Sequence, residues 1–463
     1  MSQEYCILNL LNIEDKNINL TQNFYKIEKF GDIYYKVIEA KLTYKPEFCP
    51  RCGCVFNSEQ NYEKNGFITS DILMLDICNH GCILRLHKQR FLCHCCNKKF
   101  IAKTKIVNDG CFISNQVKYA IALELKKKIS EVDIAHRFRV SPNTVERVID
   151  SYYESKKLYK NYLPEILSFD EFKSVKSADG AMSFHMCDGK TGKTIDIVED
   201  RRLNNLMRYF SYYTHEARSK VKLIVIDMYS PYVSLIKVMF PNANIIIDKF
   251  HLINLISTSL NKTRIKIMKK DKKNYNKLKR YWRLLLKSQD ELDNTRWKKY
   301  WCFDKMMTQS DIVDYLINVN KELNETYEVY QSLLYSLKHN EYHLLETALN
   351  EQHSNISEYM KTSIKTLKIY LPHIKNTLSN PYHNGFVEGN NNFIKVLKRI
   401  AFGFRSFRRF KARIMICKNL LYIKKLMLIK HQLHSNFFII FGFHPLFDKE
   451  PYILSNLFIF ALF

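Results

Sequence analysis

The pattern of apolar and polar positions changes several times along the chain, and each change predicts a different kind of structure. Between residues 33 and 92, apolar and polar residues alternate in runs such as 68–77 and 82–92, which is the period of half-buried β-strands. From residue 114 to about 153 the apolar residues recur at helical spacing. Short continuous apolar runs follow between residues 166 and 248, and residues 252–375 combine long helical periodicity with almost no glycine. The pattern therefore predicts a mixed α and β chain of several domains.

The helical stretch at residues 116–150 predicts a helix-turn-helix. Ser130 and Ser141 are each well placed to cap the start of a helix, and Pro142 suits the first helical position. A core for two short helices joined by a tight turn is available from Ala135, Val140, Val145 and Val148. Because the second helix of such a unit reads the DNA major groove, the residues expected to face DNA are Asn143, Thr144 and Arg147. A plain helical hairpin within a packed bundle is the alternative.

The apolar runs between residues 166 and 248 predict buried strands, and three of them end on an aspartate: Asp170, Asp227 and Asp248. Their order along the chain is strand, hairpin, helix, strand, helix, strand, which is that of a ribonuclease-H-like sheet. In such a sheet Asp170 and Asp227 lie side by side, where two carboxylates can share a divalent cation that neutralises their repulsion. An aspartate after an apolar strand is also a common helix cap, so each acid alone is weak support.

A single acid, Glu388, stands in a polar turn at residues 383–390, directly before a strongly basic segment. Between residues 395 and 413 that segment carries eight Lys or Arg residues and no Asp or Glu. One carboxylate held beside so much positive charge is suited to keeping a metal ion next to a polyanion. The residues expected to neutralise DNA phosphates are Lys395, Lys398, Arg399, Arg405, Arg408 and Arg409.

Cysteine is concentrated near the start of the chain, where eight of the thirteen cysteines fall between residues 49 and 96. Two CxxC pairs at expected tight turns can present four thiolates to Zn²⁺, and these are Cys49, Cys52, Cys93 and Cys96. With the strand-like runs between them they predict a zinc ribbon at residues 46–100. The neighbours that compete as ligands are Cys54, Cys78, Cys82, Cys95, His80 and His94. Ordinary buried or free thiols are the alternative.

The charge balance favours a polyanionic partner. The chain has 463 residues, 72 Lys and Arg against 46 Asp and Glu, and a formal net charge of +26. Nucleic acid is the first candidate and an anionic membrane surface the second. The amino terminus lacks the basic start and apolar run of a signal peptide, and no apolar run reaches the roughly 18–20 residues needed to span a bilayer. These features indicate a soluble protein of the reducing cytoplasm.

The chain resembles bacterial insertion-sequence transposases of the DDE class, specifically the ISL-three-like family. The resemblance rests on CPRCG and CHCC in the ribbon, the helix-turn-helix, SFDEF around Asp170, VIDMYSPY around Asp227, IIIDKFH around Asp248 and the long block YHNGFVEGNNNFIKVLKRIAFGFRSF around Glu388. It implies a ribonuclease-H-like catalytic domain interrupted by a helical insertion. It also implies an acidic triad of Asp170, Asp227 and Glu388, which would hold Mg²⁺ or Mn²⁺. Asp248 and His251 are expected close to the metal, with Asp248 as the main rival for a place in the triad.

The resemblance implies a metal-dependent enzyme that cleaves DNA at terminal inverted repeats and joins the ends to target DNA. Its expected partner is double-stranded DNA, and a homodimer or higher oligomer is expected because two ends are handled together. A non-catalytic DNA-binding regulator and a nuclease without strand transfer are the alternatives. The expected regions are 1–112 with the ribbon, 113–160 with the helix-turn-helix, 161–251 and 376–430 as two parts of the catalytic domain, 252–375 as the all-α insertion, and 431–463 as an apolar tail that matches nothing in the family.

Overall fold

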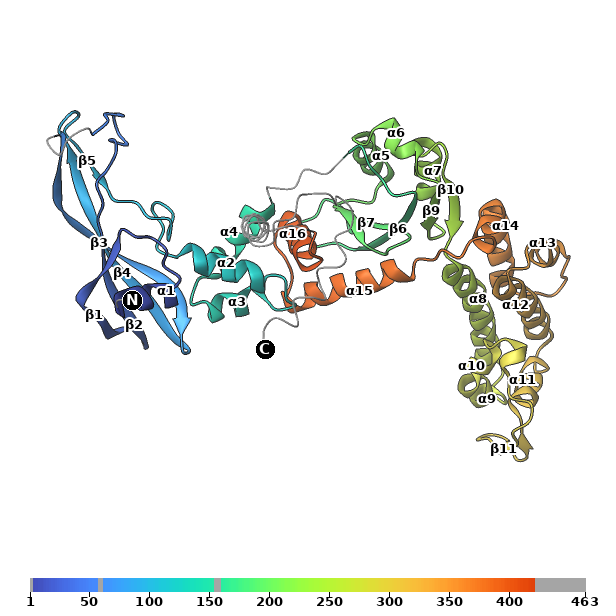
Figure 1. Ribbon diagram of the computed structural model, residues 1–463. Coiled ribbons are helices and arrows are strands. Elements are labelled where there is room, and N and C mark those ends of the chain that lie inside the picture. The colour runs from blue at the N-terminus through green and yellow to red at the C-terminus, as the bar shows by residue number, and fades with distance from the viewer. Residues whose placement is uncertain (1–2, 57–60, 154–159, 421–463) are drawn as a thin grey trace, which may run out of the picture. The chain divides into compact units, whose positions relative to one another are not determined.

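The computed structural model describes residues 3–56, 61–153 and 160–420, and the chain divides into two compact units (Figure 1). The N-terminal unit consists of Met1–Lys156 together with the residues from Ala412 onward. The central unit consists of Lys157–Lys411. The chain therefore leaves the first unit and returns to it near its end. The apolar tail expected at 431–463 lies outside the described residues.

A five-stranded sheet forms most of the N-terminal unit. The strands run in the order β1-β2-β4-β3, and β5 pairs with β4. The alternating pattern thus produces strands as expected, although they are longer than the apolar runs that predicted them. Leu86 and Phe91 of β4 are fully buried in the core of this unit. The elements are α1 (Gln3–Leu10), β1 (Ile18–Phe30), β2 (Ile33–Leu42), β3 (Tyr62–Ile77), β4 (His80–Cys93) and β5 (Lys98–Ile101).

The helical part of the N-terminal unit contains α2 (Asn115–Glu124), α3 (Glu131–Arg137), α4 (Pro142–Tyr153) and α16 (Phe407–Cys417). Ser130 caps α3, because its hydroxyl accepts a hydrogen bond from the backbone N–H of Asp133 at 3.0 Å. The core expected for a helix-turn-helix is present, with Val145 fully buried between the helices. Three residues of α16 complete this core, namely Ala412, Met415 and Ile416.

Arg413 of α16 is buried in the same part of the unit, with 1% of its surface exposed. Its guanidinium donates hydrogen bonds to the backbone carbonyls of Leu125, Lys127 and Ile129, the latter two at 3.1 and 2.8 Å. These carbonyls follow the end of α2, where a helix leaves its last acceptors without partners. A residue near the end of the chain thus satisfies backbone groups almost three hundred positions earlier.

A second five-stranded sheet organises the central unit, in the order β10-β9-β6-β7-β8 (Figure 1). β10, β9 and β6 are parallel neighbours, whereas β6, β7 and β8 form an antiparallel meander. The stretch between β8 and β9 forms two helices, and Thr214 caps the start of the second one. The elements are β6 (Ile166–Lys173), β7 (Met182–Asp188), β8 (Thr194–Val198), α5 (Leu203–Ser211), α6 (His215–Ser219), β9 (Leu223–Ile226), α7 (Ser230–Met239) and β10 (Asn244–Ile247).

The segment between β10 and residue 378 is mainly helical and shares one core with the sheet. Thr377 connects the two, since its hydroxyl accepts a bond from the N–H of Ile247 at 2.9 Å. A small two-stranded ribbon, which the helical periodicity did not predict, interrupts the helices. The elements are α8 (Lys249–Lys270), α9 (Tyr275–Arg280), α10 (Trp282–Leu285), the 3-10 helix η2 (Gln289–Glu291), β11 (Lys298–Lys299), β12 (Met306–Met307), α11 (Gln309–Ile317), α12 (Lys321–His339), α13 (Tyr342–Asn350), α14 (Glu358–Leu378) and α15 (Gly385–Ile400).

The fold is thus a mixed α/β architecture with several domains. None of the helices in the part of the chain that the structure describes has the length and apolar character required to cross a bilayer.

Candidate functional site

Three aspartates lie level with one another at one edge of the central sheet. Paired residues of β6 and β9 differ by 57 in number (223 − 166), and the same offset, continued along the strands, brings Asp170 level with Asp227. Paired residues of β9 and β10 differ by 21 (244 − 223), which brings Asp227 level with Asp248. Because neighbouring strands are about 4.8 Å apart, the three carboxyl groups share a single edge. This pairing of Asp170 and Asp227 is the one that their positions in the sequence predicted.

Two asparagines that flank Glu388 connect helix α15 to the same edge. The Nδ2 group of Asn384, the residue before α15, donates to Asp227 Oδ1 at 3.4 Å, and that of Asn391 donates to Asp170 Oδ2 at 2.6 Å. Glu388 stands between them along the chain, four positions after Asn384 and three before Asn391. Its side chain is exposed, whereas both asparagines are buried.

The environment of the aspartates opposes their ionisation. Burial raises the pKa of Asp170 to about 7, and the charges of Asp227 and Glu171 act in the same direction. Burial also raises the pKa of Asp227 to about 7, assisted by the charges of Glu171 and Asp248. Like charges that crowd a partly buried site disfavour the charged form of each group. A cation bound between the carboxylates would remove this penalty.

Asp248 and His251 lie close to Asp227. His251 Nε2 is 3.1 Å from Asp227 Oδ1, and one ligand atom from each of Asp227, Asp248 and His251 lies within 4.8 Å of the others. The side chain of Asp248 is buried. Both residues are therefore beside the acidic edge, as expected for groups that assist a metal site.

The donor set at this edge fits a hard divalent cation, because carboxylate and amide oxygens are the ligands that Mg²⁺ and Mn²⁺ prefer. Asn384 supports this fit independently. Its Nδ2 donates to Asp227 and to the carbonyl of Phe169, whereas its buried Oδ1 has no hydrogen-bond partner among the described residues. An unsatisfied buried acceptor costs about 1–3 kcal/mol. The water molecules of a hydrated cation are donors that would satisfy it.

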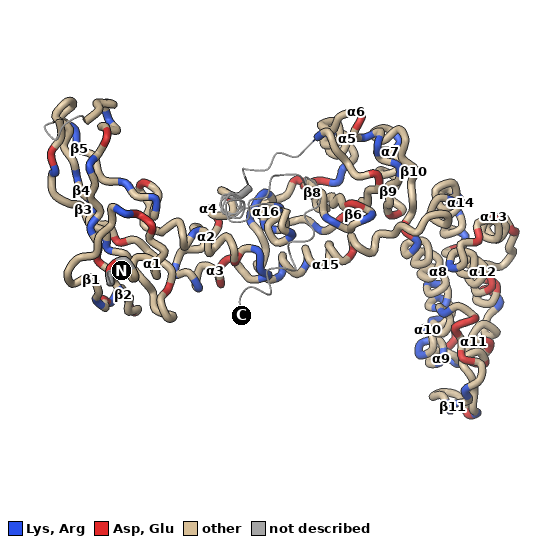
Figure 2. Tube along the Cα trace, viewed as in Figure 1, with Lys and Arg blue, Asp and Glu red and all other residues tan. Residues whose placement is uncertain are grey.

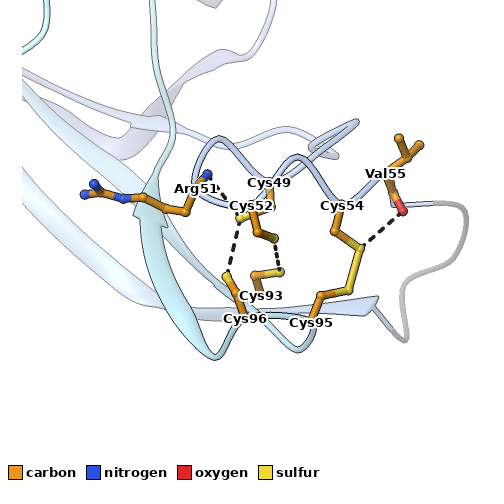
Figure 3. The surroundings of a disulfide bond; sticks show 8 residues. All are labelled: Cys49, Arg51, Cys52, Cys54, Val55, Cys93, Cys95 and Cys96. Atoms are coloured by element: carbon orange, nitrogen blue, oxygen red, sulfur yellow. Dashed lines mark hydrogen bonds between the residues drawn. A yellow bond between two sulfur atoms is a disulfide. The ribbon is translucent and has the colours of Figure 1, made fainter.

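The four predicted zinc ligands lie together in the N-terminal unit (Figure 3). Cys49 and Cys52 come from a turn before β3, Cys93 ends β4, and Cys96 lies in the turn between β4 and β5. The sulfur atoms of Cys49 and Cys96 are 3.8 Å apart and those of Cys52 and Cys93 are 3.9 Å apart. Sulfurs placed tetrahedrally at the Zn–S distance of about 2.3 Å would be about 3.8 Å apart. The arrangement therefore has the dimensions of a structural zinc site.

The competing ligands take other places. Cys54 and Cys95 pair with each other in a disulfide beside the cluster (Figure 3). Cys82 is fully buried within the sheet, where burial raises the pKa of its thiol to about 11. His80 and His94 lie outside the group of four as well, as does Cys78.

The helix-turn-helix presents only part of the expected DNA-facing set. Asn143 and Arg147 of α4 are exposed. Thr144 is buried at 9% exposure, and its hydroxyl lies 3.2 Å from the hydroxyl of Ser141 at the start of the helix. A side chain engaged there packs against its own helix terminus, so Thr144 is not on the exposed face that the sequence pattern assigned to it.

The basic segment likewise separates into two groups. Figure 2 shows Lys and Arg along α15 and α16 in blue. The side chains of Lys395, Arg399, Arg405 and Arg408 are exposed, and that of Arg409 is half-buried. Lys398 differs, because its Nζ donates to the backbone carbonyls of Lys173 and Ser174 at 3.0 and 2.8 Å. Lys398 therefore fastens α15 to the end of β6.

Comparison with known protein families decides the identity. The profile of a transposase family matches residues 167–414, which is 248 of the 463 residues and includes all three acids. The chain belongs to the ISL3 family of DDE transposases. This confirms the resemblance that the sequence motifs indicated, and it places the family member among the DNA-processing enzymes of insertion sequences.

Two relatives match different shares of this chain. The transposase for insertion sequence element IS1001 of Bordetella parapertussis is 23% identical over 383 residues, which cover 81% of this chain and 90% of that protein. A protein of Lactococcus lactis subsp. lactis named ATP-dependent protease is 44% identical over 110 residues, which cover 24% of this chain and 35% of that protein. The chain thus spans about a third of the Lactococcus protein's length.

Sequence reasoning missed Asn384 and Asn391, although both stand in the block around Glu388. The available signal was their spacing from Glu388, about one helical turn on either side. Which acid each asparagine contacts depends on how α15 packs against β6 and β9, and the local sequence contains no information on that packing.

Proposed function

We propose that this transposase cleaves DNA at the ends of its insertion sequence and transfers the freed ends to target DNA, with divalent cations held by Asp170, Asp227 and Glu388. The observation that carries the proposal is the level placement of Asp170 and Asp227 on neighbouring parallel strands, with Glu388 on the helix bonded to both. The strand order supports a ribonuclease-H-like catalytic domain, since the first strand of the unit lies at the centre between the second and the fourth. On this proposal the helical segment at 252–375 is the insertion.

Each residue of the site has a defined task in this proposal. Asp170 and Asp227 provide the fixed pair of carboxylates, and exposed Glu388 provides the third, at the mouth of the site. Mg²⁺ or Mn²⁺ bound there supplies the Lewis acidity that stabilises attacking and leaving oxygens in an in-line displacement. His251 contacts Asp227 directly, and Asp248 lies beside both.

Double-stranded DNA is the proposed substrate and partner. Asn143 and Arg147 would read the terminal repeats from the major groove. The exposed basic residues of the segment after Glu388 would bind backbone phosphates beside the site. A homodimer or higher oligomer is proposed because two transposon ends must be handled in one assembly.

Zinc at the four-cysteine cluster is proposed as a structural ion. Four thiolates leave no open coordination position, which is the arrangement of structural rather than catalytic zinc. The proposed ribbon is at 46–100 and the proposed helix-turn-helix at 113–160. The second part of the catalytic domain, expected at 376–430, would end at Lys411, because the residues from Ala412 onward belong to the N-terminal unit.

The test is cleavage and joining of a labelled duplex that carries the terminal repeat, with purified full chain and Mg²⁺. We expect Asp170→Asn, Asp227→Asn and Glu388→Gln each to lose at least about 10³-fold in rate, because charge stabilisation in the transition state depends on the cation they hold. Specific binding to the repeat should change little in all three.

Matched controls are Asp179→Asn and Glu216→Gln, which neutralise exposed acids of the central unit outside the site. Both controls should retain wild-type rates. Full activity of any site variant would remove that residue from the triad. Specific binding by wild-type protein without Mg²⁺-dependent cleavage would favour a non-catalytic regulator, and cleavage without joined products would favour a nuclease.

A further inference from the structure

Two asparagines bracket Glu388 on α15, and each donates a hydrogen bond to a different aspartate of the site. Asn384 contacts Asp227 at 3.4 Å and Asn391 contacts Asp170 at 2.6 Å. Each Nδ2 group also donates to a backbone carbonyl, Asn384 to Phe169 at 3.2 Å and Asn391 to Glu171 at 3.3 Å. Both side chains are almost fully buried, with 3% and 4% exposure.

The direction of the Asn391 amide is fixed by its neighbours. The two partners of its Nδ2 are a carboxylate and a carbonyl oxygen, and both only accept hydrogen bonds from it when Asp170 is ionised. Its Oδ1 must therefore accept, and the partner there is His185 Nδ1 at 2.9 Å. His185 then carries its proton on Nδ1, and its Nε2 accepts from the Thr194 hydroxyl at 3.0 Å.

A directed chain of hydrogen bonds results, running from Thr194 through His185 and Asn391 to Asp170. His185 is fully buried and stands on β7, the strand beside β6, while Thr194 stands on β8. Three neighbouring strands thus orient one amide of α15. Because His185 bonds the amide oxygen of Asn391, the amide nitrogen is held in place to bond Asp170. This bond connects Asp170 to the helix that bears Glu388.

We infer that Asn384 and Asn391 are positioning residues that fasten the Glu388 helix to Asp227 and Asp170, so that the three carboxyl groups form one metal site before a cation or DNA binds. This inference rests on the proposed function, because it concerns the same acidic site. It assigns the preorganisation to two amides rather than to the metal. Partners that orient ligands in this way typically contribute about 10–100-fold to metal affinity.

The neighbouring residues supply matched controls for a test. Asn390 is also buried, at 9% exposure, but its Nδ2 donates to the carbonyl of Gly192 in the β7–β8 hairpin at 2.8 Å. Asn392 is exposed. Asn390 thus faces the hairpin, Asn391 faces Asp170, and Asn392 faces solvent. Comparison of their alanine variants distinguishes the loss of the contact with Asp170 from the loss of any buried amide.

The experiment titrates Mn²⁺ into zinc-loaded full chain without DNA and follows free Mn²⁺ by electron paramagnetic resonance. Asn391→Ala and Asn384→Ala should each raise the half-saturating Mn²⁺ concentration by about 10–100-fold. Asn390→Ala and Asn392→Ala should leave it unchanged, even if Asn390→Ala lowers the melting temperature. At saturating Mn²⁺ the cleavage rates of Asn391→Ala and Asn384→Ala should recover most of the wild-type value.

A wild-type Mn²⁺ affinity in Asn391→Ala and Asn384→Ala, or an equal loss in Asn390→Ala, would overturn the inference while leaving the proposed function intact. Wild-type protein whose Mn²⁺ binding is insensitive to Asp170→Asn and Asp227→Asn would overturn the proposed function and the inference with it. Circular dichroism checks the fold of each variant. Should Asn391→Ala not fold, the same titration of Asn384→Ala, which removes the contact with Asp227, tests the inference.

Discussion

The cysteine cluster and the acidic site are both suited to metals, yet the chain builds them in opposite ways. The four cysteines come from two turns within 48 residues, and an ion bound by all four would have no open coordination position. The three acids span 219 residues and come from the interior of β6, the residue after β9 and a separate helix. The first site is closed and local, whereas the second is open and assembled from distant segments. A closed site can stabilise the fold around it, and an open site keeps room for a substrate at a cost in stability.

The largest expected effect is on the fold of the N-terminal unit. Cys49→Ser, or removal of zinc by a strong chelator, should unfold the ribbon, since structural zinc contributes about 10–16 kcal/mol of apparent binding free energy to domains whose net stability is about 5–15 kcal/mol. Circular dichroism and zinc content by mass spectrometry measure this. Cys6→Ser, at an exposed cysteine outside the cluster, serves as the control. A Cys49→Ser protein that folds normally without zinc would show that the cluster is not a structural zinc site.

The acidic site should behave in the reverse way, because its charges oppose folding when no cation is bound. Asp170 and Asp227 have pKa values of about 7 in the folded protein against an ordinary value of 3.8. The folded state thus holds their protons more tightly than the unfolded chain. The stability they contribute is greatest below pH 4 and is lost as the pH rises through 7. Metal-free protein should therefore become less stable between pH 5 and 8.

Thermal unfolding with and without Mg²⁺ tests this. Asp227→Asn should have a shallower fall in melting temperature between pH 5 and 8, and should be more stable than the wild type at pH 8, with roughly 2–4 °C for each kcal/mol recovered. Mg²⁺ at pH 8 should raise the melting temperature of the wild type but not of the variant. Asp179→Asn should follow the wild type throughout. An Asp227→Asn protein that is less stable than the wild type at pH 8 would contradict the explanation that burial and neighbouring like charges make the ionised form of Asp227 unfavourable.

The smallest expected effect separates the two faces of α15 and the segment after it. Arg399→Ala or Arg405→Ala should each reduce the slope of log affinity for DNA against log salt concentration by about 1, because each removes one phosphate contact. Lys398→Ala should leave that slope unchanged and lower thermal stability instead, since Lys398 already bonds two backbone carbonyls. Fluorescence anisotropy over a salt series measures the slopes. Equal slope changes in all three variants would assign Lys398 to the phosphate-binding surface.

The sequence predicted those parts of both sites that depend on local spacing. The two CxxC pairs are a short-range pattern, and their four cysteines lie together in the structure. The apolar runs before Asp170 and Asp227 form strands, although β6 continues to Lys173, beyond Asp170. The register that makes Asp248 level with Asp227 depends on strand pairing, which no short window contains. The same is true of the Asn391 contact with Asp170, which joins residues 221 positions apart.

The remaining differences arise where two local roles compete for one side chain. Thr144 has the composition of a residue that contacts DNA, but its position next to Ser141 allows it to pack at the helix start instead. Lys398 has the charge of a phosphate ligand, but two backbone carbonyls at the end of β6 are within its reach. Only the packed structure distinguishes the outcomes.

The return of α16 to the helix-turn-helix has a consequence for how the protein is made. Ala412, Met415 and Ile416 complete the apolar core of that unit, and Arg413 satisfies its open carbonyls. During synthesis the ribosome must therefore produce the whole central unit before the core of α2, α3 and α4 can be completed. A fragment that ends at residue 156, or a reading frame truncated before residue 412, would leave that core open to solvent. Folding of these helices is thereby coupled to synthesis of the central unit.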